Sequence, residues 1–426
     1  MKKNRNEKIR TAILHYTTSP VIGGVEAVIH AHAVQFASHG YPLTIISGRG
    51  SADALPAGVA YRQIPEMDSL HPDIAAATEI LNTGKVPADF DRLVDGLEEQ
   101  LRPLVVDHDH VIVHNVFTKH FNLPLTVALF RLMDEGAIRS ALAWCHDLSW
   151  SSPNSRSKVF PAYPWNLLKS DHPRMSYITI SAQRKHEILF TYGIDPGRVQ
   201  IIYNGVDLAG VLGLTSEGAE LIGRMGLLQA DLILLMPVRV TRAKNIEYAL
   251  QVTAELKKLG CRPRLVLSGP PDPHDPDSQA YFASLLKLRR ELGVEEEMQF
   301  VFQNGVDPAG GHIVGLDVVY DLYRVADLMF MPSHREGFGM PVLEAGLAGI
   351  PVFSTPVPAA SELAANEAYI FTPQTDAVEL AAQIRQWMEE SREYRLRRRV
   401  RRQYTWQAIF EHDLLPILEA NRPDAS

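Results

Sequence analysis

The sequence predicts an α/β protein that contains two doubly wound domains, each built on a parallel sheet. Short apolar segments rich in Val, Ile and Leu alternate along the chain with segments whose apolar residues recur at helical spacing. Short continuous apolar segments are typical of strands buried on both faces, and their alternation with helices indicates βαβ units. The strand segments form two series of five or six, and each series is long enough for one sheet.

An Asn-Gly turn at 204–205 separates the two series. The strands expected before this turn are 13–16, 43–47, 111–113, 141–145, 177–181 and 199–203. Those expected after it are 232–236, 265–267, 300–302, 328–331 and 351–354. Ligands of doubly wound sheets bind beyond the carboxyl ends of the strands, so we expect these ends to face each other across a cleft.

Composition excludes several classes of protein. The chain has 426 residues, of which 46% are hydrophobic, and a formal charge of −8, which excludes a disordered chain, a collagen and a coiled-coil rod. The negative charge argues against non-specific nucleic-acid binding. Cys145 and Cys261 are the only cysteines, and we expect both thiols to be free and buried in a reducing compartment. We find neither a signal peptide nor an apolar segment of about 20 residues, so a cytoplasmic location is expected.

The stretch 334–345 is the most informative about a binding site. Gly337 and Gly339 let the backbone approach a ligand, and Pro341 suits the first turn of a helix. Glu336 then precedes this helix and Glu344 lies about one turn inside it, so two carboxylates can accept hydrogen bonds from paired hydroxyls. The structural alternative is a glycine-rich loop with Glu344 on a solvated helix face.

Two cations follow the expected strand 232–236. The planar guanidinium of Arg239 can donate two hydrogen bonds to a diphosphate, and the ammonium of Lys244 can bind it as a point charge. The alternative is a pair of surface cations on a loop.

Two further features follow strands of the first series. Gly23 and Gly24 lie between the first strand and the first helix, where backbone amides face a helix start. His146 follows the strand 141–145 and can donate a hydrogen bond or transfer a proton, although a lone histidine is more often structural. Metal binding at 107–110 or at 30–32 is disfavoured, because the first stretch precedes a strand and the second lies on a helix.

Taken together, these motifs resemble the retaining glycosyltransferases of family 4, which have the GT-B fold. The motifs are Gly23-Gly24-Val25-Glu26, His146-Asp147, Asn204-Gly205-Val206-Asp207, Arg239 with Lys244, and Glu336-Gly337-Phe338-Gly339 with Glu344. The pair of glutamates with seven residues between them is the most specific of these. Tyr203 departs from the family pattern, which commonly has proline there, and Val238 and Asn245 stand where glycines often occur.

The resemblance implies a role for each matched residue. Arg239 and Lys244 would bind the donor diphosphate, and Glu344 would bind the ribose hydroxyls. Glu336 would contact the transferred sugar, together with the amides of Gly337, Phe338 and Gly339. Gly23 and Gly24 would face the diphosphate from the first domain, and His146 would lie beside the sugar.

The resemblance also implies the reaction, which is transfer of a hexose from a GDP-mannose or UDP-glucose type of donor to an acceptor hydroxyl, with retention and without a metal or other cofactor. The expected partners are the donor and a small sugar, glycoside or glycan acceptor, and no nucleic acid is expected. The implied domains are 1–205 on the acceptor side and 206–404 on the donor side, with a last helix at about 405–426 packed on the first. Two alternatives remain, a nucleotide-sugar epimerase and a non-catalytic nucleotide-sugar-binding protein.

Two segments have open roles. The stretch 147–173 combines aromatic residues with cations that could bind an anionic acceptor, or its aromatic residues could pack the loop on the domain. The arginine-rich stretch 392–402 could contact an anionic membrane, but a solvated helix face is the favoured interpretation because no apolar stripe accompanies it.

Overall fold

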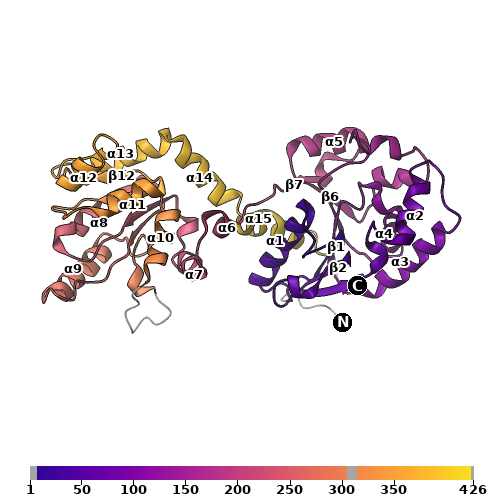
Figure 1. Cartoon of the computed structure of the whole chain (residues 1–426), viewed down its shortest axis with the longest axis horizontal. Helices are drawn as coiled ribbons and strands as arrows, with labels where there is room; N and C mark the ends of the chain where they lie inside the picture. Colours follow the sequence, from indigo (N-terminus) through magenta and orange to yellow (C-terminus); the bar gives the residue numbers. More distant parts are fainter. Residues whose placement is uncertain (1–6, 305–313, 424–426) are drawn as a thin grey trace. The chain divides into compact units, whose positions relative to one another are not determined.

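The computed structural model describes residues 7–304 and 314–423. The chain divides into two compact units, one formed by Met1–Val206 with Tyr404–Ser426 and the other by Asp207–Gln403. Figure 1 labels helices and strands of both units. No helix among the described residues is long and apolar enough to cross a membrane.

The first unit contains a seven-stranded parallel sheet in the order β3-β2-β1-β4-β5-β6-β7. Its strands are β1 (Thr11–Thr17), β2 (Leu43–Arg49), β3 (Ala60–Gln63), β4 (His110–His114), β5 (Ala141–Cys145), β6 (Met175–Thr179) and β7 (Val199–Ile201). Its helices are α1 (Gly24–Ser38), α2 (Pro72–Leu81), α3 (Phe90–Val105), α4 (Leu123–Asp134), α5 (Ala182–Tyr192), α15 (Trp406–Ile409) and α16 (Leu415–Ala420). The chain leaves β1 toward β2 on one side and returns to β4 on the other, so the strand order reverses between β1 and β4.

The second unit contains a six-stranded parallel sheet in the order β10-β9-β8-β11-β12-β13. Its strands are β8 (Leu232–Met236), β9 (Pro263–Leu267), β10 (Met298–Phe300), β11 (Leu328–Met331), β12 (Val352–Ser354) and β13 (Tyr369–Ile370). Its helices are α6 (Leu208–Leu212), α7 (Ser216–Arg224), α8 (Ile246–Lys258), α9 (Ser278–Glu291), α10 (Leu316–Val325), α11 (Met340–Ala348), α12 (Pro358–Leu363), α13 (Ala377–Glu390) and α14 (Arg392–Gln403). Here the order reverses between β8 and β11.

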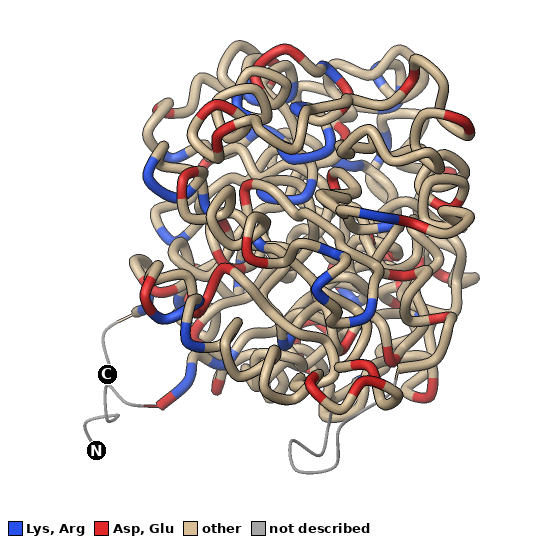
Figure 2. Tube along the Cα trace, turned by 90° about the vertical axis from the view of Figure 1, so that its left-hand side faces the viewer, with Lys and Arg blue, Asp and Glu red and all other residues tan. Residues whose placement is uncertain are grey.

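Both sheets are covered by apolar side chains on their two faces, as the continuous apolar segments predict. In β1, Leu14 packs in one core cluster, whereas its neighbour Ile13 packs in the cluster on the opposite face. Successive side chains of a strand point to opposite faces, so a strand buried on both sides must be apolar throughout. Lys, Arg, Asp and Glu are interspersed along the chain (Figure 2).

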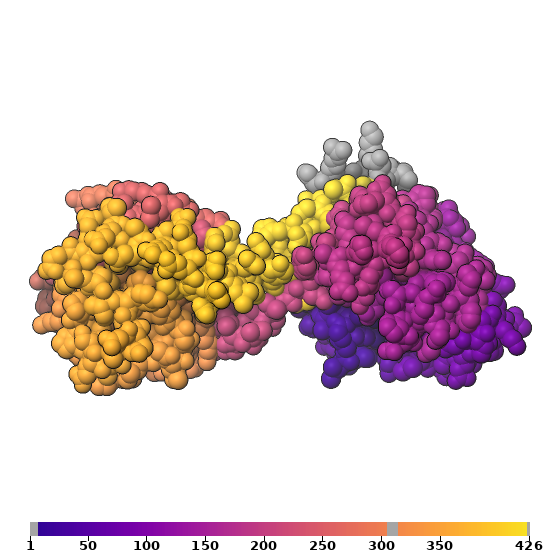
Figure 3. All heavy atoms as spheres, turned by 90° about the horizontal axis from the view of Figure 1, so that it is seen from above, coloured from indigo at the N-terminus to yellow at the C-terminus, as the bar shows by residue number. Residues whose placement is uncertain are grey.

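The carboxyl-terminal segment packs on the first unit. Ile409 and Phe410 of this segment share a core cluster with Ile13 and Phe36, and Val206 pairs with Thr405 in an isolated bridge. Figure 3 shows this segment, in yellow, at the surface beside later residues of the first unit, in magenta.

The expected strands 141–145, 232–236 and 328–331 are confirmed with their bounds. The strand expected at 300–302 was misplaced, because β10 ends at Phe300 and a 3-10 turn occupies Val301–Gln303. The edge strands β3 and β13 were not predicted, since their residues are exposed or half-buried and form no continuous apolar segment. Cys145 and Cys261 are both free and buried, as expected.

Candidate functional site

The candidate site of the second unit lies at the carboxyl ends of β8 and β11, where the strand order reverses. These two strands are parallel neighbours, so the loops that follow them emerge at the same edge of the sheet. The loops meet directly, because the backbone N–H of His334 donates to the carbonyl oxygen of Ala243 at 2.8 Å. This edge is where doubly wound sheets bind ligands.

Lys244 and Glu336 form an ion pair at this edge. The Nζ atom of Lys244 lies 2.6 Å from Oε2 of Glu336, and the two side chains are only 19% and 6% exposed. The hydroxyl of Ser333 donates to the other carboxylate oxygen, Oε1, at 2.5 Å. Glu336 is thus held from two sides, while the Lys244 ammonium keeps donors beyond the one directed at Glu336.

Arg239 does not join this pair in the described structure. Its side chain is 61% exposed, and one of its guanidinium nitrogens lies 3.8 Å from the carboxylate of Asp272. Arg239 nevertheless follows β8, as Lys244 does, so both cations project from the loop at the same sheet edge. A long exposed arginine can reorient toward an anion, whereas Lys244 is already oriented by its carboxylate partner.

Gly337 to Gly339 lead into α11. Gly339 adopts φ +88° at the N-cap, and a Cβ atom there would lie 2.5 Å from the Cβ of Ala359, so only glycine fits. The N–H groups of Gly337, Phe338 and Gly339 donate to no backbone carbonyl among the described residues. The start of this helix therefore presents backbone donors, with the positive end of the helix dipole behind them.

Glu344 lies one turn inside α11, as predicted, and has a partner that sequence reasoning missed. The hydroxyl of Tyr323 on α10 donates to Oε2 of Glu344 at 2.6 Å. Burial, followed by the bond to Glu344, raises the pKa of Tyr323, so the phenol stays protonated and keeps donating. No local pattern in the sequence links residues 323 and 344.

In the first unit, His146 is buried at the carboxyl end of β5. Its backbone N–H and that of Asp147 donate to Oδ1 of Asn115, at 2.9 and 3.2 Å. Its Nε2 atom lies 3.0 Å from Nδ1 of His114, and the two rings stack. Burial, followed by the nearby charge of His15, lowers the pKa of His146 to about 3, so the imidazole is neutral at physiological pH.

His114 is a second residue that sequence reasoning missed, although a signal was present. It ends the apolar strand β4 in the way that His146 follows β5, and parallel neighbouring strands bring such positions together. His15 of β1 extends the row, since its Nδ1 atom lies 2.9 Å from the carbonyl oxygen of His114 and its Nε2 atom 3.8 Å from Glu26.

The glycine loop lies at the start of α1, as predicted. Gly23 is the N-cap of the helix, and Gly24 is its first residue. A Cβ atom at Gly24 would meet nothing within 4 Å, so open space lies in front of this position. The hydroxyl of Thr17, at the end of β1, donates to the carboxylate of Glu26 and ties the helix start to the strand.

The structure decides one open interpretation of the sequence and corrects another. Trp150 and Trp165 of the 147–173 stretch are buried in the core, so the alternative in which aromatic rings pack the loop on the domain is confirmed for these two residues. The arginine-rich helix α14 is not a solvated face throughout, because Arg401 is buried. The roles predicted for the other site residues stay predictions, as does the cleft between the domains.

Comparison with known proteins identifies the family. Residues 22–209 match the family described as Glycosyltransferase Family 4, and residues 225–404 match Glycosyl transferases group 1. The chain is 26% identical over 371 residues to D-inositol 3-phosphate glycosyltransferase 1 of Catenulispora acidiphila, which covers 82% of this chain and 79% of that protein. It is 24% identical over 423 residues to glycogen synthase of Mycobacterium tuberculosis, with 94% and 92% covered. With the two parallel sheets above, these matches show that the chain belongs to glycosyltransferase family 4 and has the α/β GT-B fold.

Proposed function

We propose that this glycosyltransferase moves a hexose from a nucleotide diphosphate sugar, of the GDP-mannose or UDP-glucose type, to an acceptor hydroxyl with retention at the anomeric carbon. The observation that carries the proposal is the Lys244–Glu336 pair at the carboxyl ends of β8 and β11. A cation suited to a phosphate and a carboxylate suited to hydroxyls lie side by side there, and these groups match the diphosphate and the sugar hydroxyls of a nucleotide sugar.

The donor would bind as follows. Lys244 and Arg239 would bind the diphosphate, and the amides of Gly337 to Gly339 would extend this positive environment. The carboxylate of Glu336 lies against the Lys244 ammonium, which would bind the diphosphate. Glu336 would accept hydrogen bonds from hydroxyls of the transferred hexose. Glu344, oriented by Tyr323, would accept from the ribose hydroxyls.

The leaving group is a diphosphate, whose negative charge grows as the bond to the anomeric carbon breaks. Lys244, Arg239 and the start of α11 would stabilise this charge, so the proposal requires no divalent metal. The acceptor hydroxyl would attack from the face that the phosphate leaves, and the departing phosphate would take its proton. Its pKa of about 3 makes His146 a poor base at neutral pH, so we assign His146 a hydrogen bond to the sugar.

Donor binding is tested by thermal-shift titration with UDP, GDP and ADP. A nucleotide at about one hundred times its dissociation constant should stabilise the protein by about 2.7 kcal/mol. The variant Lys244→Ala should lose this stabilisation and lower kcat/KM by roughly ten- to one-hundredfold, because it removes a charge-assisted hydrogen bond. The control is Lys287→Ala, since that side chain is 72% exposed on α9. Unchanged kinetics in Lys244→Ala would remove this residue from the site.

Product analysis separates the proposal from its alternatives. Transfer releases a free nucleoside diphosphate, epimerisation yields an isomeric nucleotide sugar, and a binding protein yields neither. Retention is tested by the anomeric configuration of the product. Activity should survive excess EDTA, and a loss that magnesium or manganese restores would contradict the metal-free mechanism.

A further inference from the structure

Lys119 lies at the carboxyl edge of the first sheet, in the loop after β4, where the strand order reverses between β1 and β4. The same loop supports the segment that carries His146. Asn115 accepts from the backbone of His146, and the hydroxyl of Thr118 donates to the carbonyl oxygen of Asp147 at 2.7 Å. Lys119 is therefore held by the framework that positions His146.

The side chain of Lys119 is buried without a carboxylate partner. The residue is 7% exposed, and no carboxylate oxygen of the described residues lies within 4.0 Å of its ammonium. Its contacts are the hydroxyl of Ser155, at 3.4 Å from Nζ, and the ring of Phe121, with Nζ 4.7 Å from the centroid. An ammonium has three donors, and a buried charge that lacks a counter-ion is costly.

The charges around Lys119 act in both directions. Burial lowers the pKa of Lys119 most, the charge of Asp147 raises it, and the cations Arg184 and Lys158 lower it. Asp147, however, is already 3.1 Å from a guanidinium nitrogen of Arg184.

Two more cations in the 147–173 loop flank one ring. The guanidinium of Arg156 lies 4.8 Å and Nζ of Lys169 lies 4.3 Å from the ring centroid of Trp150. Ser155, which contacts Lys119, directly precedes Arg156 in the chain. The 147–173 loop thus brings Ser155 and several cations next to the buried Lys119 of the neighbouring loop, and no carboxylate of the described residues pairs with that lysine.

We propose that Lys119, together with Ser155 and the cations of the 147–173 loop, binds an anionic group, a phosphate or a carboxylate, carried by the sugar acceptor. The proposal rests on the glycosyl transfer proposed above and adds the chemical class of the acceptor. The anion would supply the missing counter-charge of Lys119. The loop after β4, which carries Lys119, also supports His146, so the acceptor would be bound near the residue assigned to the transferred sugar.

The test measures binding of three matched probes to the full-length protein by calorimetry. Glucose 6-phosphate, glucuronate and glucose share a skeleton and differ in the phosphate, the carboxylate or neither, and inorganic phosphate tests a free anion. The wild type should bind one of the two anionic sugars about tenfold or more tightly than glucose, as expected for a charge-assisted hydrogen bond. Which of them binds identifies the anion, and equally tight binding of inorganic phosphate would overturn the assignment to an acceptor.

Variants then assign the preference to Lys119. Lys119→Met should abolish the preference for the anionic sugar, and Lys119→Arg should retain most of it. Lys85→Met, at an exposed position of the same unit, should bind as the wild type does. If Lys119→Met fails to fold, Lys119→Gln replaces it. A wild type without anionic preference, or a preference that survives in Lys119→Met, would overturn the proposal.

Nucleotide binding keeps this test independent of the proposed function. Lys119→Met should bind UDP or GDP as the wild type does, because Lys119 is not among the residues assigned to the donor. Anion preference without any nucleotide binding would refute the proposed function and leave the anion site standing. Nucleotide binding without anion preference would refute the anion site and leave the proposed function standing.

Discussion

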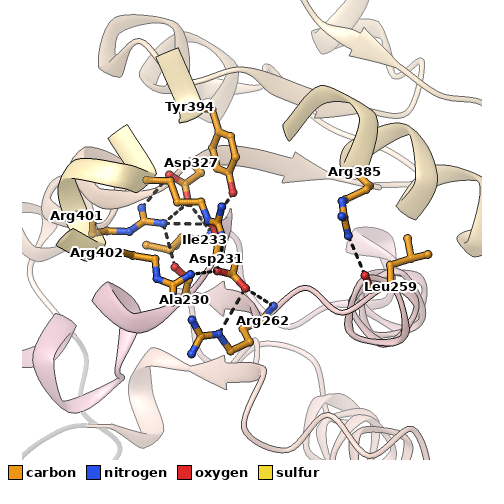
Figure 4. Close-up of polar contacts among 11 residues, drawn as sticks. Ala230, Asp231, Ile233, Leu259, Arg262, Asp327, Arg385, Tyr394, Arg401 and Arg402 are labelled. Carbon is orange, nitrogen blue, oxygen red and sulfur yellow. Dashed lines mark hydrogen bonds and ion pairs between the residues drawn. The ribbon is translucent and has the colours of Figure 1, made fainter. Parts of the chain in front are cut away.

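The buried ion pair between Arg401 and Asp327 provides the most quantitative prediction for the second unit. Both guanidinium NH groups of Arg401 on α14 donate to the carboxylate of Asp327, each at 2.9 Å, and the side chains are 4% and 0% exposed (Figure 4). Asp327 also accepts from the backbone N–H of Ile233 in β8 and directly precedes β11. The pair thus joins α14 to the two strands whose loops carry Lys244 and Glu336.

Arg401→Met would leave the carboxylate of Asp327 buried without its cation. Breaking a buried pair from one side costs about 3–5 kcal/mol, a large part of the roughly 5–15 kcal/mol by which a typical domain is stable. Arg399→Met is the matched control on the same helix, because Arg399 is exposed, and its effect should stay within about 0.5 kcal/mol. Arg401→Met with Asp327→Asn should recover part of the loss, since the uncompensated charge is removed.

Hydrogen exchange of peptides that cover β8 and β11 is the suitable measurement, because a two-unit chain need not unfold in one step. Their protection should fall in Arg401→Met by the equivalent of 3–5 kcal/mol, roughly a hundred- to several-thousandfold. A loss below about 1 kcal/mol, or a double variant as unstable as the sum of the single variants, would refute this reasoning.

Three further predictions follow from the sites. Tyr323→Phe removes the hydrogen-bond donor to Glu344, so nucleoside diphosphate affinity in calorimetry should fall up to about tenfold with little change in fold. Unchanged affinity would refute the assignment of Glu344 to the ribose. His146→Ala should lower kcat at least about tenfold while nucleotide affinity stays near that of the wild type, and the wild-type pH profile should show no midpoint near 6.5 from this residue, because its pKa is about 3. Burial also lowers the pKa of His32 from 6.5 to about 3, so the unfolded state binds more protons and stability should fall between pH 6.5 and 3, by about 2 kcal/mol at pH 5. In denaturant titrations at pH 7 and pH 5, His32→Leu should reduce this pH dependence, and an unchanged difference would contradict the burial argument.

Much of the fold could be predicted from the sequence, because strands buried on both faces must be continuously apolar. The bounds of β5, β8 and β11 follow from this rule alone. The start of α11 could be predicted as well, since glycine and proline restrict the backbone locally. The edge strands β3 and β13 escape the rule, because partial exposure removes the apolar pattern.

The candidate site could be predicted in part. Residues that follow neighbouring parallel strands share one edge, so the approach of Lys244 and Glu336 follows from topology although 92 positions separate them. The contact of Tyr323 with Glu344 could not be predicted, since it depends on how α10 packs against α11.

The sequence by itself determined the alternation of strands and helices and the glycine-flanked glutamates, because short-range sterics and the burial of apolar side chains act within a few residues. Tertiary structure alone decided which charges are buried. The arginines of α14 look alike in sequence, yet Arg401 is buried against Asp327 whereas Arg399 is exposed. Lys119 is likewise an ordinary lysine in the sequence. The free energy of a charge depends on the solvent and counter-ions around it, and distant parts of the chain exclude that solvent and supply those counter-ions.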